Sequence, residues 1–282
     1  MKKMVNLMKN ILLWTVCLIM ITPVLCLFSG AFMDQLELTE LLGPVLNHTE
    51  GLAAWHFLPQ FPTLQNLVEL LLDSLEFYQT FWNSLKITLF TLVGQLIFAM
   101  PAAWGLAVYE FPGRKQLYFL YVILMMLPFQ VTMLSEYLAL DRLQLIDSHW
   151  AIIMPGVFST FSVFLMYRFF WGVPKEVIEA ARIDGAGEFI IFLHIGIPLG
   201  KAGIISAMVL QFLESFHQME RPLVFLKNKE LWPLSMYLPE IDISQAGFAF
   251  CASLFALLPA VLVFLFGQEY LEQGIACTVQ KE

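Results

Sequence analysis

Charged residues are scarce in this chain. Of its 282 residues only 13% are Asp, Glu, Lys or Arg, whereas 59% are hydrophobic and the mean hydropathy is +0.73. A soluble domain of this length carries roughly a quarter charged residues. The deficit of charge argues against an ordinary soluble domain, and the apolar surplus predicts burial in a lipid bilayer.

Basic residues and metal-ligating patterns are scarce as well. The chain has 15 Lys and Arg against 23 Asp and Glu, a net charge of −8. Proteins that bind nucleic acid present a basic face, so the sequence predicts no nucleic-acid partner. The cysteines form no CxxC or Cys/His metal spacing, and we interpret them as small apolar side chains in helices. They are Cys17, Cys26, Cys251 and Cys277.

Six apolar stretches recur along the chain, each long enough to cross about 30 Å of hydrocarbon. They predict an all-α integral membrane protein with one transmembrane domain over 1–282. Its six helices are expected at about 10–33, 87–109, 116–138, 148–171, 199–219 and 243–268. The lysines before the first stretch resemble those of a signal peptide, but we expect this helix to be retained, because the run is long and no clean cleavage site follows.

The distribution of Lys and Arg predicts the orientation of the helices. With the N-terminus in the cytoplasm, ten of these residues fall inside and five outside. Both termini are therefore predicted to be cytoplasmic. Residues 34–82 then form a long outer loop, and residues 172–198 form an inner loop between the fourth and fifth helices.

Part of the outer loop has helical periodicity. Its apolar positions are Leu64, Leu67, Val68, Leu71, Leu72 and Leu75, and the acidic positions on the opposite face are Glu69, Asp73 and Glu76. Such an amphipathic helix can rest on the membrane surface or pack on the bundle. Docking of a partner is a further alternative, which the sequence favours less.

The inner loop contains a short helical pattern. Pro174 suits the first turn of a helix, and Gly185 and Gly187 follow where the end of a helix often requires positive φ. One face of this helix has small side chains, so another protein could approach its backbone closely. That face consists of Val177, Ala180, Ala181 and Asp184.

The inner loop resembles the EAA loop of binding-protein-dependent ABC permeases. The resemblance rests on Glu179-Ala180-Ala181, on Gly185 four residues later, and on Ile195-Gly196-Ile197-Pro198 after nine more residues. The fuller form Glu-Ala-Ala-Arg-Ile-Asp-Gly-Ala is similar to the carbohydrate-uptake branch of that family. Further similarities to that branch are Asn83-Ser84, Pro112-Gly113-Arg114, Leu127-Pro128 and the stretch from Gln268 to Gly274.

This resemblance implies a permease subunit of a bacterial ABC importer in the cell membrane, forming half of the pathway for a carbohydrate. It implies a second homologous permease subunit, two ATP-binding subunits, an extracytoplasmic solute-binding protein and surrounding lipid as partners. ATP would bind to the ATPase subunits, so we expect no enzyme activity, cofactor, metal or catalytic residue in this chain. The residues expected to couple to the ATPase are Glu179, Ala180, Ala181, Asp184, Gly185 and Pro198.

A polar stripe interrupts the fifth predicted helix. An acid such as Glu214 costs roughly 3 kcal/mol at the centre of a membrane helix, so it should face the bundle interior, a cavity or a partner. The stripe consists of Gln211, Glu214, Ser215 and Gln218, which share one helical face. It either binds sugar hydroxyls along the translocation path or joins helices between permease subunits. We favour the second interpretation.

Other functions stay open at this point. The main alternative is an ABC permease for a non-sugar cargo or in a non-import complex. An ion-coupled secondary transporter would need charged groups in several helices, and only Glu214 clearly qualifies. A membrane-embedded enzyme would need a catalytic constellation at one depth, and we find none in the sequence.

Overall fold

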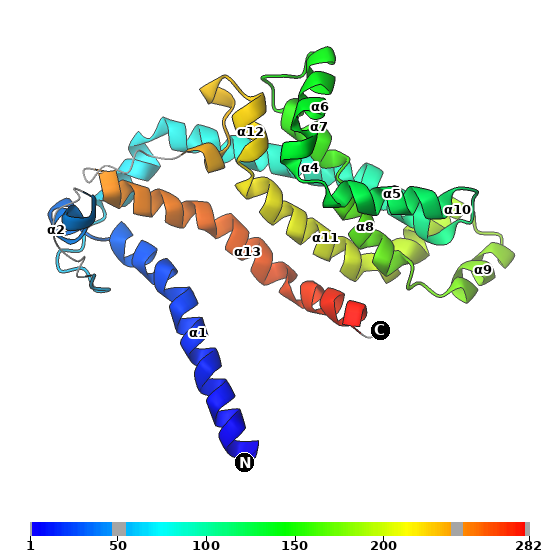
Figure 1. The fold of residues 1–282 in the computed structure, drawn as a ribbon, viewed down its shortest axis with the longest axis horizontal. Coiled ribbons are helices and arrows are strands. Elements are labelled where there is room, and N and C mark those ends of the chain that lie inside the picture. The colour runs from blue at the N-terminus through cyan, green and yellow to red at the C-terminus, as the bar shows by residue number, and fades with distance from the viewer. Residues whose placement is uncertain (1, 47–54, 238–244, 280–282) are drawn as a thin grey trace. The chain divides into compact units, whose positions relative to one another are not determined.

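The computed structural model describes residues 2–46, 55–237 and 245–279. Over these residues the chain is helical, and its one isolated β-bridge joins Met33 to Pro62 (Figure 1). The prediction of an all-α fold is confirmed.

The described part of the chain consists mainly of α-helices, with four short turns of other helical types. The α-helices are α1 (Lys2–Ala31), α2 (Gln35–Leu46), α3 (Gln65–Val68), α4 (Leu75–Val108), α5 (Arg114–Met126), α6 (Phe129–Arg142), α7 (Trp150–Val157), α8 (Thr160–Phe170), α9 (Lys175–Ile183), α10 (Glu188–Ile191), α11 (Ile197–His217), α12 (Glu220–Phe225) and α13 (Ala246–Val279). π-helical turns occur at η1 (Glu69–Asp73) and η2 (Phe192–Gly196), and 3₁₀ turns at η3 (Lys229–Leu231) and η4 (Leu234–Met236).

Several of these helices are suited to cross a membrane. Within the described residues, five helical stretches are long and apolar enough: Asn6–Ala31, Leu75–Val108, Trp150–Phe170, Glu188–His217 and Ala246–Gln273. The bent pair of α5 and α6 makes a sixth if it counts as one span. These stretches overlap the six apolar runs of the sequence, although the helices Leu75–Val108 and Glu188–His217 begin about ten residues earlier than expected.

The third predicted helix, 116–138, is not one straight helix. α5 and α6 are bent by 105°. Leu127, between them, has an extended backbone with φ −74° and ψ 122°, because a residue before proline avoids the α conformation. Pro128 also has no N–H to continue the helix. The uncharged run therefore located the two helices but not the bend between them.

The chain divides into two compact units. The first consists of Met1–Tyr78 and Tyr237–Pro259. Its small core contains Met33, Leu38, Leu41 and Ala246. The single transmembrane domain over 1–282 stays a prediction.

A buried acid ties two segments of the first unit together. The Glu37 carboxylate on α2 accepts hydrogen bonds from the N–H groups of Gln60 (2.9 Å) and Phe61 (3.2 Å) and contacts the His56 ring. Burial raises the pKa of this carboxyl, but these hydrogen bonds outweigh burial and hold the pKa below its ordinary value. Residues 56–61 are thus fixed against α2.

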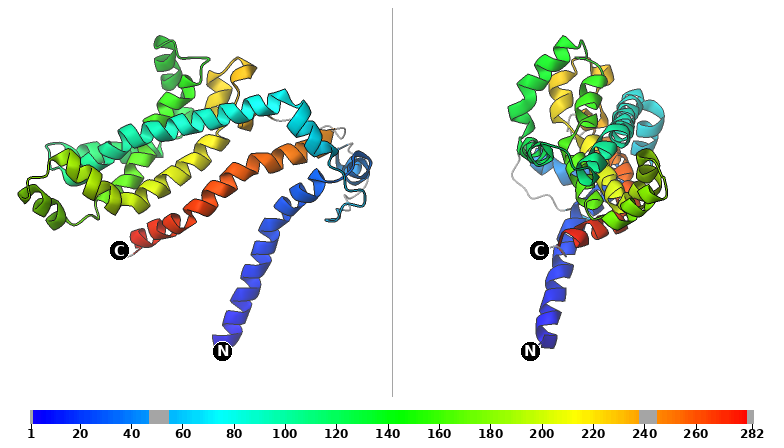
Figure 2. Two further views of the ribbon diagram at one scale, coloured as in Figure 1. Left: turned by 180° about the vertical axis from the view of Figure 1, so that it is seen from behind. Right: turned by 90° about the vertical axis from the view of Figure 1, so that its right-hand side faces the viewer.

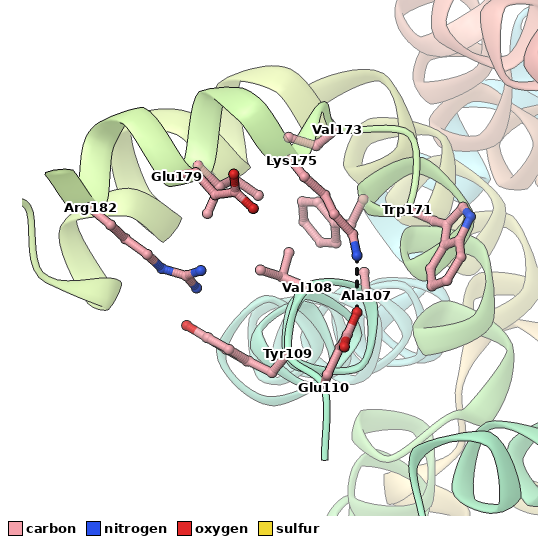
Figure 3. A pocket seen from close by; sticks show the side chains of 11 residues that line it. Ala107, Val108, Tyr109, Glu110, Trp171, Val173, Lys175, Glu179 and Arg182 are labelled. Carbon is pink, nitrogen blue, oxygen red and sulfur yellow. Dashed lines mark hydrogen bonds and ion pairs between the residues drawn. The ribbon is translucent and has the colours of Figure 1, made fainter.

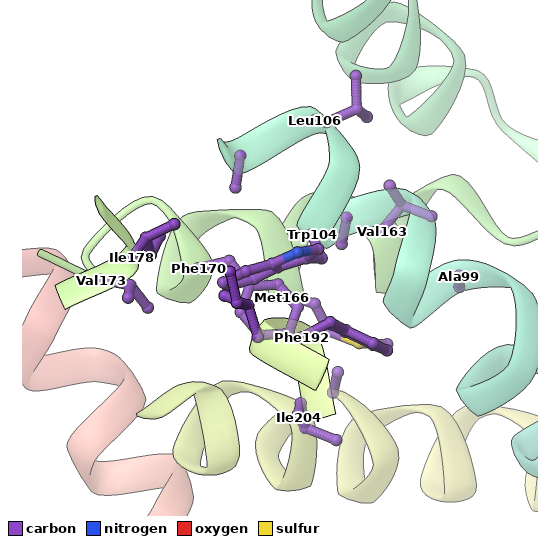
Figure 4. Close-up of a cluster of buried hydrophobic side chains, with 14 residues drawn as sticks. Ala99, Trp104, Leu106, Val163, Met166, Phe170, Val173, Ile178, Phe192 and Ile204 are labelled. Atoms are coloured by element: carbon purple, nitrogen blue, oxygen red, sulfur yellow. The ribbon is translucent and has the colours of Figure 1, made fainter. Parts of the chain in front are cut away.

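The second unit consists of Gln79–Met236 and Ala260–Glu282. Its largest core cluster surrounds Trp104, Phe170 and Phe192 (Figure 4). Within this unit α8 and α11 lie side by side (Figure 2). Glycines permit this approach, because a Cβ on Gly200 would lie 2.3 Å from the Phe170 ring and one on Gly203 2.2 Å from the Phe169 ring. The close packing fixes the end of α8, from which the inner loop begins.

Candidate functional site

The inner loop forms the expected short helix, α9. Pro174 precedes it with an extended backbone, and Gly185 follows it with φ +84°. The Ala186 N–H donates to the Ala181 carbonyl and the Gly185 N–H to the Arg182 carbonyl, both at 3.0 Å. These two bonds form a Schellman motif, which satisfies the last carbonyls of the helix. Of the two glycines only Gly185 has a positive φ, because Gly187 has a φ of −69°.

α9 buries one side and exposes the other. Ile178 is only 3% exposed, and Ala181 packs with it against the core cluster of the second unit. The face expected from the sequence is therefore divided. Ala181 lies three residues after Ile178 on the same side of the helix, so burial of the larger side chain brings Ala181 inward. The exposed face of α9 consists of Val177, Ala180, Ile183 and Asp184.

Polar contacts fix the direction of α9. Arg182 donates to both carboxylate oxygens of Glu188, with Nε–Oε1 at 2.6 Å and Nη2–Oε2 at 3.1 Å. The Tyr109 hydroxyl donates to Oε2 of the same carboxylate at 2.8 Å. Lys175 Nζ lies 3.0 Å from Glu110 Oε1 (Figure 3), and this hydrogen bond and charge hold the pKa of Glu110 below its usual value. The exposed pair adds little stability, but together these contacts join α9 to α4 and α10.

A pocket of about 490 Å³ lies between the ends of α4 and α8 and the inner side of α9. Tyr109, Trp171, Lys175 and Arg182 are among its lining residues (Figure 3). Glu179, the first residue of the Glu-Ala-Ala triplet, also lines this pocket. Glu179 is itself exposed, but it borders this pocket and is turned by about 100° around α9 from its neighbour Ala180.

Pro198 lies in the first turn of α11. α10, η2 and α11 follow one another without a break in the helical backbone. A π-helical turn holds one residue more than an α turn and frequently marks a functional region. Here it brings Gly196 against the Trp104 ring, where a Cβ would lie 2.8 Å from the nearest ring carbon.

The predicted path residues divide into two environments. Gln211 is 4% exposed, and its Nε2 donates to Ser215 Oγ at 2.9 Å. Gln218 caps α11, and its backbone carbonyl accepts a bond from Ser235 Oγ at 2.6 Å. Glu214 lies on the same face of α11 but is exposed. Gln211 and Ser215 are thus brought together, and Glu214 is not among their contacts.

Gln211 belongs to a buried network that the sequence pattern missed. The Ser162 hydroxyl on α8 lies 2.9 Å from Gln95 Oε1 and 3.1 Å from Gln211 Oε1. Gln95 Nε2 donates to the Gly156 carbonyl at 2.7 Å. Gly156 lies in the last turn of α7, and its carbonyl also accepts the Ser159 N–H at 3.1 Å, so Gln95 adds a second hydrogen bond at the break between α7 and α8. The one available signal was a glutamine within an uncharged helix, which favours bonding between helices.

The sequence of this chain matches a known protein family. Residues 95–276 match the model of the family described as "Binding-protein-dependent transport system inner membrane component". The chain belongs to this family. It is therefore a multi-pass inner-membrane protein and a permease of an ABC importer, as the inner loop indicated.

Relatives of the permease match over most of its length. The arabinooligosaccharides transport system permease protein AraQ of Bacillus subtilis is 33% identical over 262 residues, which cover 92% of this chain and 89% of AraQ. The sn-glycerol-3-phosphate transport system permease protein UgpE of Brucella abortus is 28% identical over 202 residues, covering 70% of this chain and 72% of UgpE.

A solved structure shares the fold of the permease. It is described as a bacterial ABC transporter involved in the import of the acidic polysaccharide alginate. The TM-score is 0.80 and the sequence identity 21%, and the match covers 95% of this chain and 96% of that chain.

Proposed function

We propose that the permease conducts a carbohydrate and couples its import to ATP hydrolysis by a separate ATPase subunit, on which α9 docks. The observation that carries this proposal is the two-sidedness of α9. Ile178 and Ala181 fix the helix to the core, whereas the residues of the opposite face are exposed.

The exposed face of α9 has the chemistry of a docking surface. Ile183 is 86% exposed, and Ala180 allows close approach to the helix backbone. Burying one such isoleucine stabilises a complex by roughly 1.5–3 kcal/mol. Because the inner side of α9 packs on the cluster around Trp104 and Phe170, displacement of α9 by the ATPase would act on α4 and α8 directly.

The names of relatives support a carbohydrate cargo. AraQ is named for arabinooligosaccharides, and UgpE is named for sn-glycerol-3-phosphate. The higher identity and wider coverage of AraQ favour an oligosaccharide over an organophosphate. A non-sugar cargo is the alternative, and a transport assay with both kinds of substrate distinguishes the two.

The proposed complex contains further subunits. A second permease subunit would complete the pathway and two ATPase subunits would bind ATP. A solute-binding protein would deliver the cargo, in agreement with the words "binding-protein-dependent" in the family description. We assign Glu214 to contact with the second permease subunit, because it is exposed on a membrane helix and an acid in hydrocarbon needs a polar partner.

Ala180→Trp tests the coupling. The indole would overpack the docking surface, which costs roughly 1–3 kcal/mol, or about a 5- to 150-fold loss of ATPase affinity. Ala139→Trp on α6 is the matched control, because Ala139 is also an exposed helical alanine. The measurements are ATPase co-purification and substrate-stimulated ATP hydrolysis in proteoliposomes. Docking by α9 is wrong if Ala180→Trp leaves both unchanged.

The cargo is tested with the same proteoliposomes and the cognate binding protein. We expect ATP-dependent uptake of labelled arabino-oligosaccharides and no uptake of glycerol-3-phosphate. Uptake of glycerol-3-phosphate alone would overturn the carbohydrate assignment while leaving the ATPase coupling intact.

A further inference from the structure

An exposed apolar stripe runs along residues 64–75 of the first unit, over α3, η1 and the first residue of α4. Leu64, Val68, Leu72 and Leu75 expose 59%, 47%, 77% and 79% of their surface. Leu64 precedes α3, where its carbonyl accepts the Val68 N–H, and Leu72 lies in the π-helical turn η1. A spacing of four residues returns to within about 40° of the same side in both an α-helix and a π-helix, so these three lie close to one side. Leu70 is fully buried on another side. These four residues are called the outer stripe below.

The beginning of this segment is tied to the end of a candidate membrane span. The Thr63 N–H donates to the Phe32 carbonyl at 2.8 Å. The Asn66 amide donates to the carbonyls of Ala31 (3.2 Å) and Met33 (3.1 Å). Ala31 is the last residue of the span Asn6–Ala31. The start of the segment therefore lies where this span leaves the hydrocarbon.

The end of the segment is tied to two more candidate spans. After Ser74 the chain enters α4 directly, and the Phe77 ring contacts Phe255 of α13 edge to face, with centroids 6.5 Å apart. Near the start of α13, a Cβ on Gly247 would lie 2.5 Å from the Asn66 amide. Both ends of the segment are thus held at the level where membrane helices begin or end, so the segment cannot stand far out in water.

The charges of the segment favour lipid as the occupant of the outer stripe. Glu69 and Asp73 are exposed. Each directly follows a stripe residue and is thus turned by roughly 80–100° from it around the helix, so these carboxylates can stay in water while the stripe meets acyl chains. An apolar face beside a charged face is the pattern of a helix that lies in the membrane interface. The segment from 64 to 75 contains no Lys or Arg, so anionic headgroups would add no attraction.

We propose that the outer stripe inserts among the acyl chains of the membrane, and that the helical residues 65–73 lie in the membrane interface. By the Lys/Arg distribution this is the outer leaflet. The segment would then hold the first unit at the level of the bilayer surface. Its attachment depends on apolar burial rather than on charge, and it does not depend on the cargo or on docking of α9.

Fluorescence quenching tests this insertion on the assembled complex. The four native cysteines are replaced, uptake is verified, and bimane is attached after Leu72→Cys or, as matched control, Asp73→Cys. In phosphatidylcholine vesicles containing doxyl lipid, we expect several-fold stronger lipid quenching at position 72 than at 73, and stronger iodide quenching at 73. Leu64→Cys and Glu69→Cys provide a second pair on the same two sides.

Three results would overturn the proposal. The first is equal iodide quenching at 72 and 73, which would place the stripe in water. The second is an absence of lipid quenching at 72, combined with iodide quenching that disappears only when binding protein is added. That result would show that the stripe docks a protein. The third is lipid quenching at 72 that requires phosphatidylglycerol, because the proposed contact is apolar. Equal quenching with and without phosphatidylglycerol supports it.

Discussion

Gly185 ends α9 in a conformation that an added methyl group would disfavour. Its φ is +84°, and a Cβ built there meets nothing within 4 Å. The cost of Gly185→Ala is therefore conformational rather than steric, about 1–2 kcal/mol for a left-handed residue with a side chain. We expect the last turn of α9 to unwind in part, which removes the Schellman bonds and displaces Ile183 and Asp184.

The consequence appears in ATPase affinity. If docking must restore the native turn, a cost of about 1–2 kcal/mol weakens the Kd roughly 5- to 30-fold. The assay is titration of purified ATPase onto the permease in lipid nanodiscs. Gly187→Ala is the matched control, because Gly187 has an ordinary φ of −69° and equally open surroundings. Equal effects of the two substitutions, or no loss with Gly185→Ala, would refute this reasoning.

Two further predictions concern the polar groups of the membrane helices. Gln95→Met nearly preserves volume but removes two hydrogen bonds, the one to the Gly156 carbonyl and the one from the Ser162 hydroxyl. The Gly156 carbonyl keeps the Ser159 N–H, so we expect roughly 0.5–1.5 kcal/mol for each lost bond and a lower Tm of the purified permease. Ser162→Ala, which keeps the Gln95–Gly156 bond, should cost less, and the reverse order would contradict the role of Gln95. Glu214→Gln should reduce co-purification of the second permease subunit by the equivalent of about 0.6–2 kcal/mol, with unchanged uptake per assembled complex. Lower uptake per complex with normal co-purification would place Glu214 in the path instead.

The positions of the membrane helices follow from the sequence because charge is excluded from hydrocarbon. The bends inside these helices were harder to predict from the sequence. Pro128 was visible, but proline is compatible with either a kink or a full break, and the 105° angle depends on how α5 and α6 pack. The break between α7 and α8 has its stabilising side chain in another helix, 61 residues before Gly156. No local pattern could indicate that contact.

The sequence predicted the short helix of the inner loop, which α9 confirms, but it did not predict which face of that helix packs inward, and the coupling role of its residues stays a prediction. Periodicity shows which residues share a face of α9, and it cannot show which face packs inward. The face that packs inward is set by Ile178, which is larger than Ala181 and is buried on the α4 and α8 side. In the outer loop, the π-helical turn η1 changes the angle between successive residues, so Leu70, absent from the periodic pattern, is the leucine that is buried.

The π-helical turn η2 has a consequence for insertions and deletions. It contributes one residue beyond an α-helical turn between α10 and α11. Deleting one residue from 192–196 would restore a regular helix but rotate α10 by about 100° around the axis. Glu188 would then leave the guanidinium of Arg182, now at 2.6 Å. The length of this stretch therefore sets the direction of α9, and a permease one residue shorter here would need a different anchor for its inner loop.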